Sequence, residues 1–435
     1  MVIPAKASDV AKRAHLRLLL DAAIAAAHPS RCLAGHWPDP PTGGRILVLG
    51  AGKAAAGMAQ AAEAYYGARG LRDRVEGLVT TRHGYGLPTQ WIEVTEASHP
   101  VPNLASVSAA EHALAFAATA RPEDLLLVLL SGGASALWSA PVKGLALDAK
   151  QALTRQLLAS GAPIGAMNLV RKHLSRIKGG RLAAAAPDGA TIVTLAISDV
   201  VGDDPSSIGS GPTVGDPTTL EQARAILSQY KVTPSAAIEA ALRDPANETP
   251  KPGAPAFVNA RYTIVAAARQ SLEAAAAVAR SLGYRVTILG DDFEGEARDV
   301  AAAHAKIALA ARGRGERVLL LSGGELTVTV TGNGAGGRNQ EFALALAQYL
   351  DGAPGITALA AGTDGADGGK GAADDPAGAF IDDTTLTRAA AADLNSATFL
   401  DNNDSGGFFS RLGDLIVTGP TQTNVNDFRA ILVAP

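Results

Sequence analysis

The sequence predicts an α/β protein of two domains with mostly parallel sheets, and two observations carry this prediction. Short apolar runs that end in glycine-rich turns recur along the chain, and alanine-rich stretches separate them. In those stretches the apolar positions return at three and four residues, which is the spacing of an amphipathic helix. Alternating strands and helices are typical of parallel sheets that are connected by right-handed crossovers.

The apolar runs have the length of buried strands, and the alanine-rich stretches have the length of helices. Strands are expected at Arg45–Gly50, Val75–Thr81, Leu125–Leu130, Thr191–Ile197, Thr263–Ala267, Tyr284–Leu289, Val318–Leu321, Ile356–Ala361 and Leu415–Val417. Helices are expected at Lys53–Glu63, Asn103–Thr119, Ala149–Ser160, Leu220–Tyr230, Ser271–Leu282, Ala297–Ala311 and Asn339–Leu350.

A proline-rich segment predicts the domain boundary. The stretch 243–255, RDPANETPKPGAP, holds four prolines in thirteen residues, so it can be neither a regular helix nor a central strand. We therefore expect one domain over 1–245 and a second over 256–435.

Composition excludes several classes of partner. The 435 residues are 47% hydrophobic and 18% charged, as in an ordinary folded protein, and the net charge of −4 attracts neither nucleic acid nor anionic lipid. Cys32 is the single cysteine, so the chain has no disulfide framework, and a reducing cytoplasm is the expected compartment. Charged residues interrupt the apolar run at 16–27, which argues against a signal peptide, and no stretch has the length of a membrane-spanning helix.

Glycine-rich turns follow three of the predicted strands. Glycines allow the close backbone approach and positive φ of a phosphate-binding loop, and such loops at the carboxyl ends of parallel strands favour anions. The first turn places glycines around Lys53, and the second and third share the sequence Leu-Leu-Ser-Gly-Gly. The candidate ligand-binding residues in these turns are Gly50, Gly52, Ser131, Gly132, Gly133, Ser135 and Glu325.

The first turn must be compared with two nucleotide-binding motifs. Its third glycine, Gly57, comes one residue too late for a dinucleotide fingerprint, and the next strand ends in Val79-Thr80-Thr81 without an acidic residue for a ribose. A P-loop also fails, because Ala54 and not Ser or Thr follows Lys53. A GxGK sequence alone is equally compatible with a structural turn, so the number of such loops carries the functional interpretation.

An acidic, hydroxyl-rich loop follows the strand that ends at Ile197. Asp199 and Asp204 could provide carboxylate ligands for Mg²⁺, and Ser210 and Gly211 could donate to phosphates. The alternative is that the aspartates cap a turn and the serines face solvent.

The segment 168–182 predicts a basic helix that ends at Gly179-Gly180. Its six basic side chains cannot share one face, so some are solvated. Arg171 could reach a substrate carboxylate, which suits the bidentate guanidinium group, whereas the alternative is an ordinary surface helix.

The C-terminal half holds a second cation and further carboxylates. Arg338 stands at the entrance of a predicted helix, where it opposes the helix dipole and needs a compensating anion, which a phosphoryl group would supply. Asp364 follows another predicted strand. Because Lys53 precedes the proline-rich boundary and Arg338 follows it, a phosphoryl-transfer site that uses both is expected in the cleft between the domains.

Eight motifs in this order resemble the type-2 glycerate kinases with their C-terminal MOFRL domain. The motifs are GAGKAA, EASHPVPN, LLSGGASAL, NLVRKHLSRIKGGRLA, ISDVVGDDPSSIGSGPT, LSGGELTVTVTGNGAGGRNQEFALA, GTDGADG…AGAF and NDSGGFF…LIVTGPTQTNVND. They cover most of the chain. The resemblance implies a Rossmann-like N-terminal domain and a smaller C-terminal α/β domain with a mixed sheet, with the MOFRL region at about 317–428.

The resemblance also implies an ATP- and Mg²⁺-dependent transfer of phosphate to D-glycerate that gives 2-phosphoglycerate. Lys53 and Arg338 are then the cations at the reacting phosphate, and Ser131, Glu325, Asp199 and Asp204 lie around nucleotide, metal and substrate. Ser98, His99 and Asn339 are also assigned to binding, although His99 before Pro100 is equally compatible with a buried turn. The sequence departs from the family at 266–275, where an asparagine is expected near Arg269.

Two other functions stay open at this point. Members of the same family are also labelled hydroxypyruvate reductase, which would require NAD(P)H, and a sugar-acid-binding protein without catalysis is the third option. The expected partners are small molecules, glycerate and ATP, and not nucleic acid or membrane. A homodimer is one candidate assembly.

Overall fold

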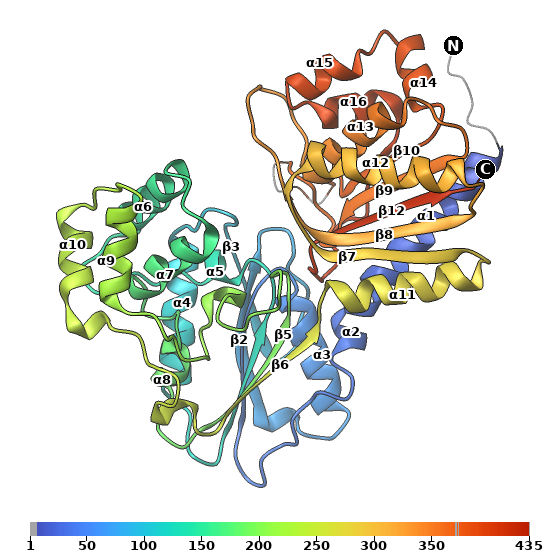
Figure 1. Ribbon diagram of the computed structural model, residues 1–435. Coiled ribbons are helices and arrows are strands. Elements are labelled where there is room, and N and C mark those ends of the chain that lie inside the picture. Colours follow the sequence, from blue (N-terminus) through green and yellow to red (C-terminus); the bar gives the residue numbers. More distant parts are fainter. Residues whose placement is uncertain (1–6, 370–371, 373, 435) are drawn as a thin grey trace. The chain divides into compact units, whose positions relative to one another are not determined.

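The computed structural model describes residues 7–369, 372 and 374–434 (Figure 1). The chain forms two compact units. Cys32–Val265 make the N-terminal unit, and Met1–Arg31 with Ala266–Pro435 make the C-terminal unit. Among the described residues, no helix combines the length and apolar character that crossing a lipid bilayer requires.

The N-terminal unit is built on a six-stranded sheet with the order β3-β2-β1-β4-β5-β6. Neighbouring strands from β3 to β5 run parallel, in unbroken register. This order, which reverses direction between β1 and β4, is that of the dinucleotide-binding folds, so a Rossmann-like sheet is confirmed. The strands are β1 (Ile46–Ala51), β2 (Val75–Arg82), β3 (Ile92–Ala97), β4 (Leu125–Leu130), β5 (Thr191–Ile197) and β6 (Ala260–Ala266).

Helices cover both faces of this sheet. Every residue of β1 and β4 is buried, as expected for central parallel strands. Figure 1 shows α3 on one face and α4 with α8 on the other. The helices and 3₁₀ turns are α3 (Ala55–Gly67), η1 (Arg72–Arg74), α4 (Leu104–Ala117), α5 (Ala134–Leu137), α6 (Leu147–Ala159), α7 (Ile164–His173), α8 (Arg181–Ala185), η2 (Ile208–Ser210), α9 (Leu220–Gln229), α10 (Ala236–Arg243), η3 (Pro245–Asn247) and η4 (Pro255–Phe257).

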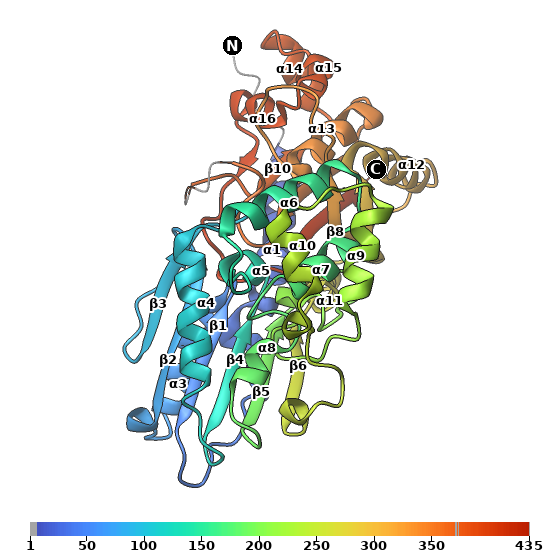
Figure 2. The same cartoon turned by 90° about the vertical axis from the view of Figure 1, so that its left-hand side faces the viewer.

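Four of these helices, α6, α7, α9 and α10, form a group with an apolar core of their own (Figure 2). Leu153 and Leu157 of α6 pack there with Val170 of α7 and with Leu227 of α9. The chain enters this group after β4 and again after β5. The group therefore brings the side chains of α6 and α7 to the carboxyl ends of the central strands.

The C-terminal unit contains a mixed sheet with the order β11-β10-β9-β12-β8-β7. Strands β7 and β8 are parallel, whereas β12 is antiparallel to both β8 and β9. The expected mixed sheet is thus confirmed. Its strands are β7 (Arg285–Glu296), β8 (Val318–Thr327), β9 (Ile356–Gly362), β10 (Gly378–Ile381), β11 (Leu415–Ile416) and β12 (Asp427–Val433).

Side chains alternate between the two faces of this sheet, as strand geometry requires. Leu319 and Leu321 pack with α1 and α11, whereas Val318 and Leu320 pack with α12 and α13 on the opposite face. The helices are α1 (Ala7–Ala27), α11 (Ala268–Ser281), α12 (Ala297–Gly313), α13 (Arg338–Leu350), α14 (Thr385–Ala391), α15 (Ser396–Asp401) and α16 (Ser405–Leu412), while α2 (Pro29–Cys32) lies at the junction of the units.

The two units differ from the expected ranges 1–245 and 256–435 in two ways. The proline-rich segment belongs to the N-terminal unit, because Thr249 donates to Asp216 there and the chain continues into β6. The first helix belongs to the C-terminal unit, because its apolar stripe packs against α11. Two amphipathic helices can pack through their apolar faces although they are far apart in the chain, and their sequences alone do not predict that pairing.

Four further segments differ from expectation. The basic segment is helical only to His173, and the chain from Leu174 to Gly180 is irregular before α8 begins. Strands β3, β10 and β12 carry no run that predicts them: Glu93 and Glu96 interrupt β3, β10 has four residues, and Arg429 interrupts β12. Tertiary pairing and not intrinsic pattern makes these segments strands.

The packing of α1 gives a stability prediction. Leu19 is fully buried in the α1–α11 core, whereas the neighbouring Leu18 is 51% exposed. We expect Leu19→Ala to lower the free energy of unfolding of the C-terminal unit by about 2–5 kcal/mol, because it leaves a cavity under the sheet. Leu18→Ala is the matched control and should change it by less than about 0.5 kcal/mol. Equal denaturant midpoints for both variants would contradict this packing.

Candidate functional site

The strand order of the N-terminal unit places its candidate site at the carboxyl ends of β1 and β4. In open α/β sheets, ligands bind where the strand order reverses. Here that point lies between β1 and β4, which are paired from Ile46 with Leu125 to Ala51 with Leu130. Both strands then run directly into the glycine-rich turns that the sequence singled out.

The two turns are locked to each other by hydrogen bonds and by close contact. The amide of Lys53 donates to the Gly132 carbonyl at 2.9 Å, and the amide of Ala54 donates to Ser131 Oγ at 3.0 Å. Gly52 has a φ of +137°, and a Cβ at this position would lie 2.1 Å from Ser131 Oγ. Glycine is therefore required here by the neighbouring turn.

Lys53, His99 and Gly133 lie together at this edge. A Cβ on Gly133 would lie 3.0 Å from His99 Cδ2 and 3.6 Å from Lys53 Cγ. All three are partly exposed. Ser98, before His99, is anchored through its amide, which donates to Asn103 Oδ1 at 3.4 Å. Three motifs that are distant in sequence thus meet at one place.

Gly50 has a different role from the other glycines of the first turn. It lies within β1, and a Cβ there would come 2.9 Å from both the Leu129 carbonyl and Val79 Cγ1. Gly50 therefore serves the packing of β1 against its neighbours, and its part in ligand binding stays a prediction.

Ser135 is the hydrogen-bonding centre of a second group beside the Gly133 turn. Its Oγ accepts from Arg171 Nη2 at 2.9 Å and from Lys178 Nζ at 2.8 Å. The Ser135 and Ser210 hydroxyl oxygens lie 2.9 Å apart. The structure therefore brings together Ser135, Arg171 and Ser210, which the sequence analysis proposed separately, and adds Lys178.

The acidic loop after β5 is folded by its own hydrogen bonds. Asp204 accepts from the Ser206 amide and from the hydroxyls of Ser206 and Ser207. Burial opposes ionisation, but these hydrogen bonds outweigh it and lower the pKa of Asp204. Gly211, with a φ of +59°, closes the same loop, where a Cβ would meet Val214 Cγ2 at 2.9 Å. The turn-capping alternative thus describes Asp204 well.

Asp199 and Asp204 both follow β5, and the charges of both act on the buried hydroxyl of Tyr262. Burial, and then the charges of Asp204 and Asp199, raise the pKa of Tyr262. Two carboxylates of one loop can provide oxygen ligands to a cation. Among the described residues, no group of three or more His, Cys, Asp or Glu side chains could hold a metal ion.

Arg338 in the C-terminal unit is already compensated by protein carboxylates. It begins α13, and its guanidinium donates to Asp427 Oδ1 at 2.9 Å and to Glu325 Oε1 at 2.9 Å. Burial disfavours the charge, yet Asp427 and Glu325 raise the pKa of Arg338. The expected counter-anion at this helix entrance is thus an aspartate and a glutamate.

Asp427 is the centre of the group of polar side chains around Arg338. Besides Arg338, it accepts from Asn339 Nδ2 at 2.8 Å and from the fully buried Arg429 at 3.3 Å. The sequence analysis missed Asp427 and Arg429 because the strand β12 that carries both was not predicted. The signal available was an acid directly before an apolar run at the end of the chain.

The start of α13 is held by Asp367 and not by Asp364. Asp367 accepts from the amides of Asn339 and Gln340 at 2.9 and 2.8 Å, where the helix dipole favours an anion. Burial raises the pKa of Asp367 to about 6 against these hydrogen bonds. Asp364 is buried in the turn after β9, where it accepts from the Ala366 amide at 3.1 Å.

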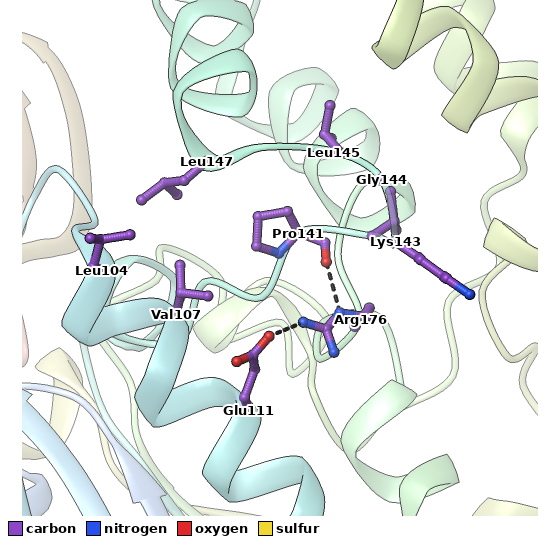
Figure 3. Close-up of a pocket in the computed structure, with 10 residues that line it drawn as sticks. Leu104, Val107, Glu111, Pro141, Lys143, Gly144, Leu145, Leu147 and Arg176 are labelled. Atoms are coloured by element: carbon purple, nitrogen blue, oxygen red, sulfur yellow. Dashed lines mark hydrogen bonds and ion pairs between the residues drawn. The ribbon is translucent and has the colours of Figure 1, made fainter.

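One pocket of the N-terminal unit lies beside α4. It has a volume of about 490 Å³ and is lined largely by apolar side chains of α4 and of the loop before α6. At one side, Arg176 donates to the Pro141 carbonyl and pairs with Glu111 (Figure 3). None of the sequence-predicted site residues lines this pocket.

Comparisons with known proteins cover nearly the whole chain. A family model described as a domain of unknown function, DUF4147, matches residues 15–243, and the MOFRL family model matches residues 318–427. The second match agrees with the expected MOFRL region.

Relatives carry two different names. An Agrobacterium vitis protein named "Putative hydroxypyruvate reductase" is 48% identical over 98% of this chain and 95% of its own. A glycerate 2-kinase of Pyrococcus horikoshii is 39% identical over 90% of this chain and 88% of its own. The crystal structure of a glycerate kinase from Thermotoga maritima superposes with a TM-score of 0.84 at 34% identity, covering 98% of this chain and 100% of that chain.

His304 beneath β8 gives a pH prediction. Its Nε2 lies 3.0 Å from Ser322 Oγ, and burial followed by the charge of Arg429 lowers the pKa of His304 to about 4. Between pH 6.5 and 4, His304 is protonated in the unfolded chain but stays neutral in the folded chain. The free energy of unfolding therefore falls as pH falls through this range. His304→Gln should flatten that fall in denaturant titrations. The exposed His36→Gln is the control, and an unchanged slope in His304→Gln would contradict a neutral buried His304.

Proposed function

The chain belongs to the family of glycerate kinases that combine a DUF4147 domain with a MOFRL domain, and we propose that it transfers the γ-phosphate of ATP to D-glycerate and forms 2-phosphoglycerate. The observation that carries the proposal within this chain is the lysine-bearing glycine turn at the point where the strand order reverses. Lys53 and the Ser131–Gly133 turn are held together there, in a position that favours phosphate.

Lys53 and Arg338 are the proposed cations at the transferring phosphoryl group. Phosphoryl transfer spreads negative charge over the equatorial oxygens, so catalysis depends on positioned positive charge more than on covalent chemistry. Lys53 extends from a rigid turn beside His99 and Gly133. Arg338 is fixed by Asp427, which leaves its planar guanidinium oriented before substrate binds. Glu325, Asn339 and Asp364 are proposed to line the nucleotide or substrate.

Magnesium would be held by Asp199 and Asp204. The fit rests on two carboxylates in the one loop that follows β5, and Mg²⁺ commonly takes only one or two carboxylates together with waters and phosphate oxygens. The ion would neutralise charge on the nucleotide phosphates. This chain's own part is to present the two carboxylates ionised, which the hydrogen bonds from Ser206 and Ser207 do for Asp204.

The reductase alternative is less well supported by the site. A dinucleotide-binding strand β2 ends in an acid that binds the ribose, whereas here its last residues are Thr80, Thr81 and Arg82. Thr80 is used internally, since its hydroxyl accepts from Trp138 Nε1 at 3.3 Å. The proposed partners are therefore glycerate and ATP. A reducing, cytoplasmic location is proposed from Cys32, the single cysteine, which is buried and forms no disulfide.

Product analysis tests the proposed reaction. With D-glycerate, ATP and Mg²⁺, the protein should release ADP together with a product that enolase alone consumes, because enolase takes 2-phosphoglycerate and not the 3-isomer. Omitting Mg²⁺ should abolish ADP release. Oxidation of NADH with hydroxypyruvate, in the absence of any ADP release with glycerate, would replace the kinase by the reductase. Binding of glycerate without either reaction would leave a sugar-acid-binding protein.

Substitution of the two cations tests their roles. Lys53→Ala and Arg338→Ala should each lower kcat by about 10²-fold or more, the scale of a lost electrostatic contact in a transition state. The exposed Lys143→Ala and Arg314→Ala are charge-matched controls and should keep normal turnover. Near-normal kcat in both site variants would remove the assignment.

A further inference from the structure

Two buried lysines and a partly buried arginine gather near Ser135. Lys150 comes from α6, Arg171 from α7, and Lys178 from the irregular chain that follows α7. Lys150 and Lys178 are 5% and 1% exposed, and Arg171 is partly exposed. Buried lysines are rare in folded proteins unless they are paired, so two of them beside an arginine need an explanation.

Ser135 binds two of the three cations. It accepts from Lys178 through both its backbone carbonyl and its hydroxyl, and from Arg171 through its hydroxyl. With both lone pairs of the hydroxyl occupied, its proton points to Ser210 Oγ, 2.9 Å away. The hydroxyl proton of Ser210 is then left to donate elsewhere.

Lys150 is the unsatisfied member of the group. Its Nζ is buried and has no hydrogen-bond partner in the part of the chain that the structure describes. No ion pair of Lys150, Arg171 or Lys178 with a carboxylate is found among the described residues. By contrast, the buried Lys172 on the same helix as Arg171 lies 3.6 Å from Asp216. The chain therefore pairs a buried lysine where the role is structural, and leaves this group without an acid.

Such a group is costly without an anion. Burial, and then the charge of Arg171, lower the pKa of Lys150 to about 7, and burial with the charges of Arg171 and Lys150 lowers the pKa of Lys178 well below its usual value. An anion in contact with the three groups would remove their mutual repulsion and restore their charge. The donors that remain free are the three protons of Lys150, the Ser210 hydroxyl and the unused guanidinium protons of Arg171.

We infer that Lys150, Arg171 and Lys178, with Ser135 and Ser210, form the pocket that binds the carboxylate of the acceptor acid. This inference rests on the proposed function, because it identifies the part of the glycerate kinase site that recognises the acid. Lys150 and Lys178 thereby become binding residues of the site.

The geometry favours a carboxylate over a phosphate at this place. Ser135 follows Gly133 by two residues, and Gly133 adjoins Lys53 and His99. A small acid whose carboxylate is bound at Ser135 could therefore present its hydroxyl group to a phosphoryl group at Lys53. An arginine fork matches the two oxygens of a carboxylate. The backbone amides of a glycine turn, which suit phosphate, belong to the neighbouring Ser131–Gly133 segment.

Binding and kinetics of Lys150→Met test the inference on the full chain. We expect this variant to weaken D-glycerate binding in calorimetry without ATP by about 10- to 100-fold, the scale of a lost charged hydrogen bond. In turnover assays KM for D-glycerate should rise by the same factor, while kcat and KM for ATP stay within about threefold. This pattern is expected when the lost contact binds the substrate equally in the ground state and in the transition state. The denaturant midpoint should stay equal or rise, because an unpaired buried charge has been removed.

The matched control is Lys143→Met, which removes an exposed lysine whose side chain extends away from the neighbouring pocket (Figure 3). It should leave every value unchanged. Inorganic phosphate and ADP are titrated in parallel: if Lys150→Met weakens their binding and not that of D-glycerate, the pocket holds a phosphoryl group and the carboxylate assignment is overturned.

The outcomes separate this inference from the proposed function. Normal kinase activity with unchanged KM and unchanged affinity for D-glycerate in Lys150→Met would overturn the inference alone. A wild-type chain without kinase activity whose glycerate binding depends on Lys150 would overturn the proposed reaction and support the pocket.

Discussion

The N-terminal unit depends on one close contact between two strand ends. Gly52 has no side chain because Ser131 occupies the space, and the amides of Lys53 and Ala54 are satisfied by Gly132 and Ser131. This contact fixes the turn after β1 to the turn after β4. The fixed pair then determines where Lys53 leaves the backbone and where the next residues, up to Ser135, can reach. A ligand-binding residue on a rigid turn loses little entropy on binding, which suits a site that works by positioning.

The two groups of cations in this protein differ in whether protein carboxylates balance their charge. In the C-terminal unit, Arg338 and Arg429 share Asp427, so the positive charge is balanced before any ligand arrives. Around Ser135, three cations form no ion pair with a carboxylate of the described residues, and burial lowers their pKa values. Preorganised pairs of the first kind orient a side chain, whereas an unbalanced group of the second kind stores an electrostatic cost that an anionic ligand relieves.

The fold does not decide the chemistry. The strand order β3-β2-β1-β4-β5-β6 is shared with nicotinamide-dependent enzymes, and relatives of this chain carry both kinase and reductase names. What distinguishes the site is local. The first glycine turn packs against Ser131, and β2 ends without an acid for a ribose. These local features are the reason for proposing a phosphoryl group beside Lys53.

Local signals in the sequence predicted the fold class, the strands at the centre of the N-terminal sheet and the glycine-rich loops, because continuous apolar runs and glycine turns do not depend on long-range contacts. The sequence also placed Lys53, Ser131, Ser135, Arg171 and Arg338 among the candidates through order and motif. Tertiary structure alone decided that α1 joins the C-terminal unit, that β12 brings Asp427 to Arg338, and that Lys150 reaches Arg171 and Lys178. These are contacts between elements far apart in the chain, where burial and partner, and not residue type, set the charge of a side chain. From sequence alone, a lysine in an amphipathic helix such as α6 is predicted to face solvent, and only the packing of that helix shows that Lys150 is buried.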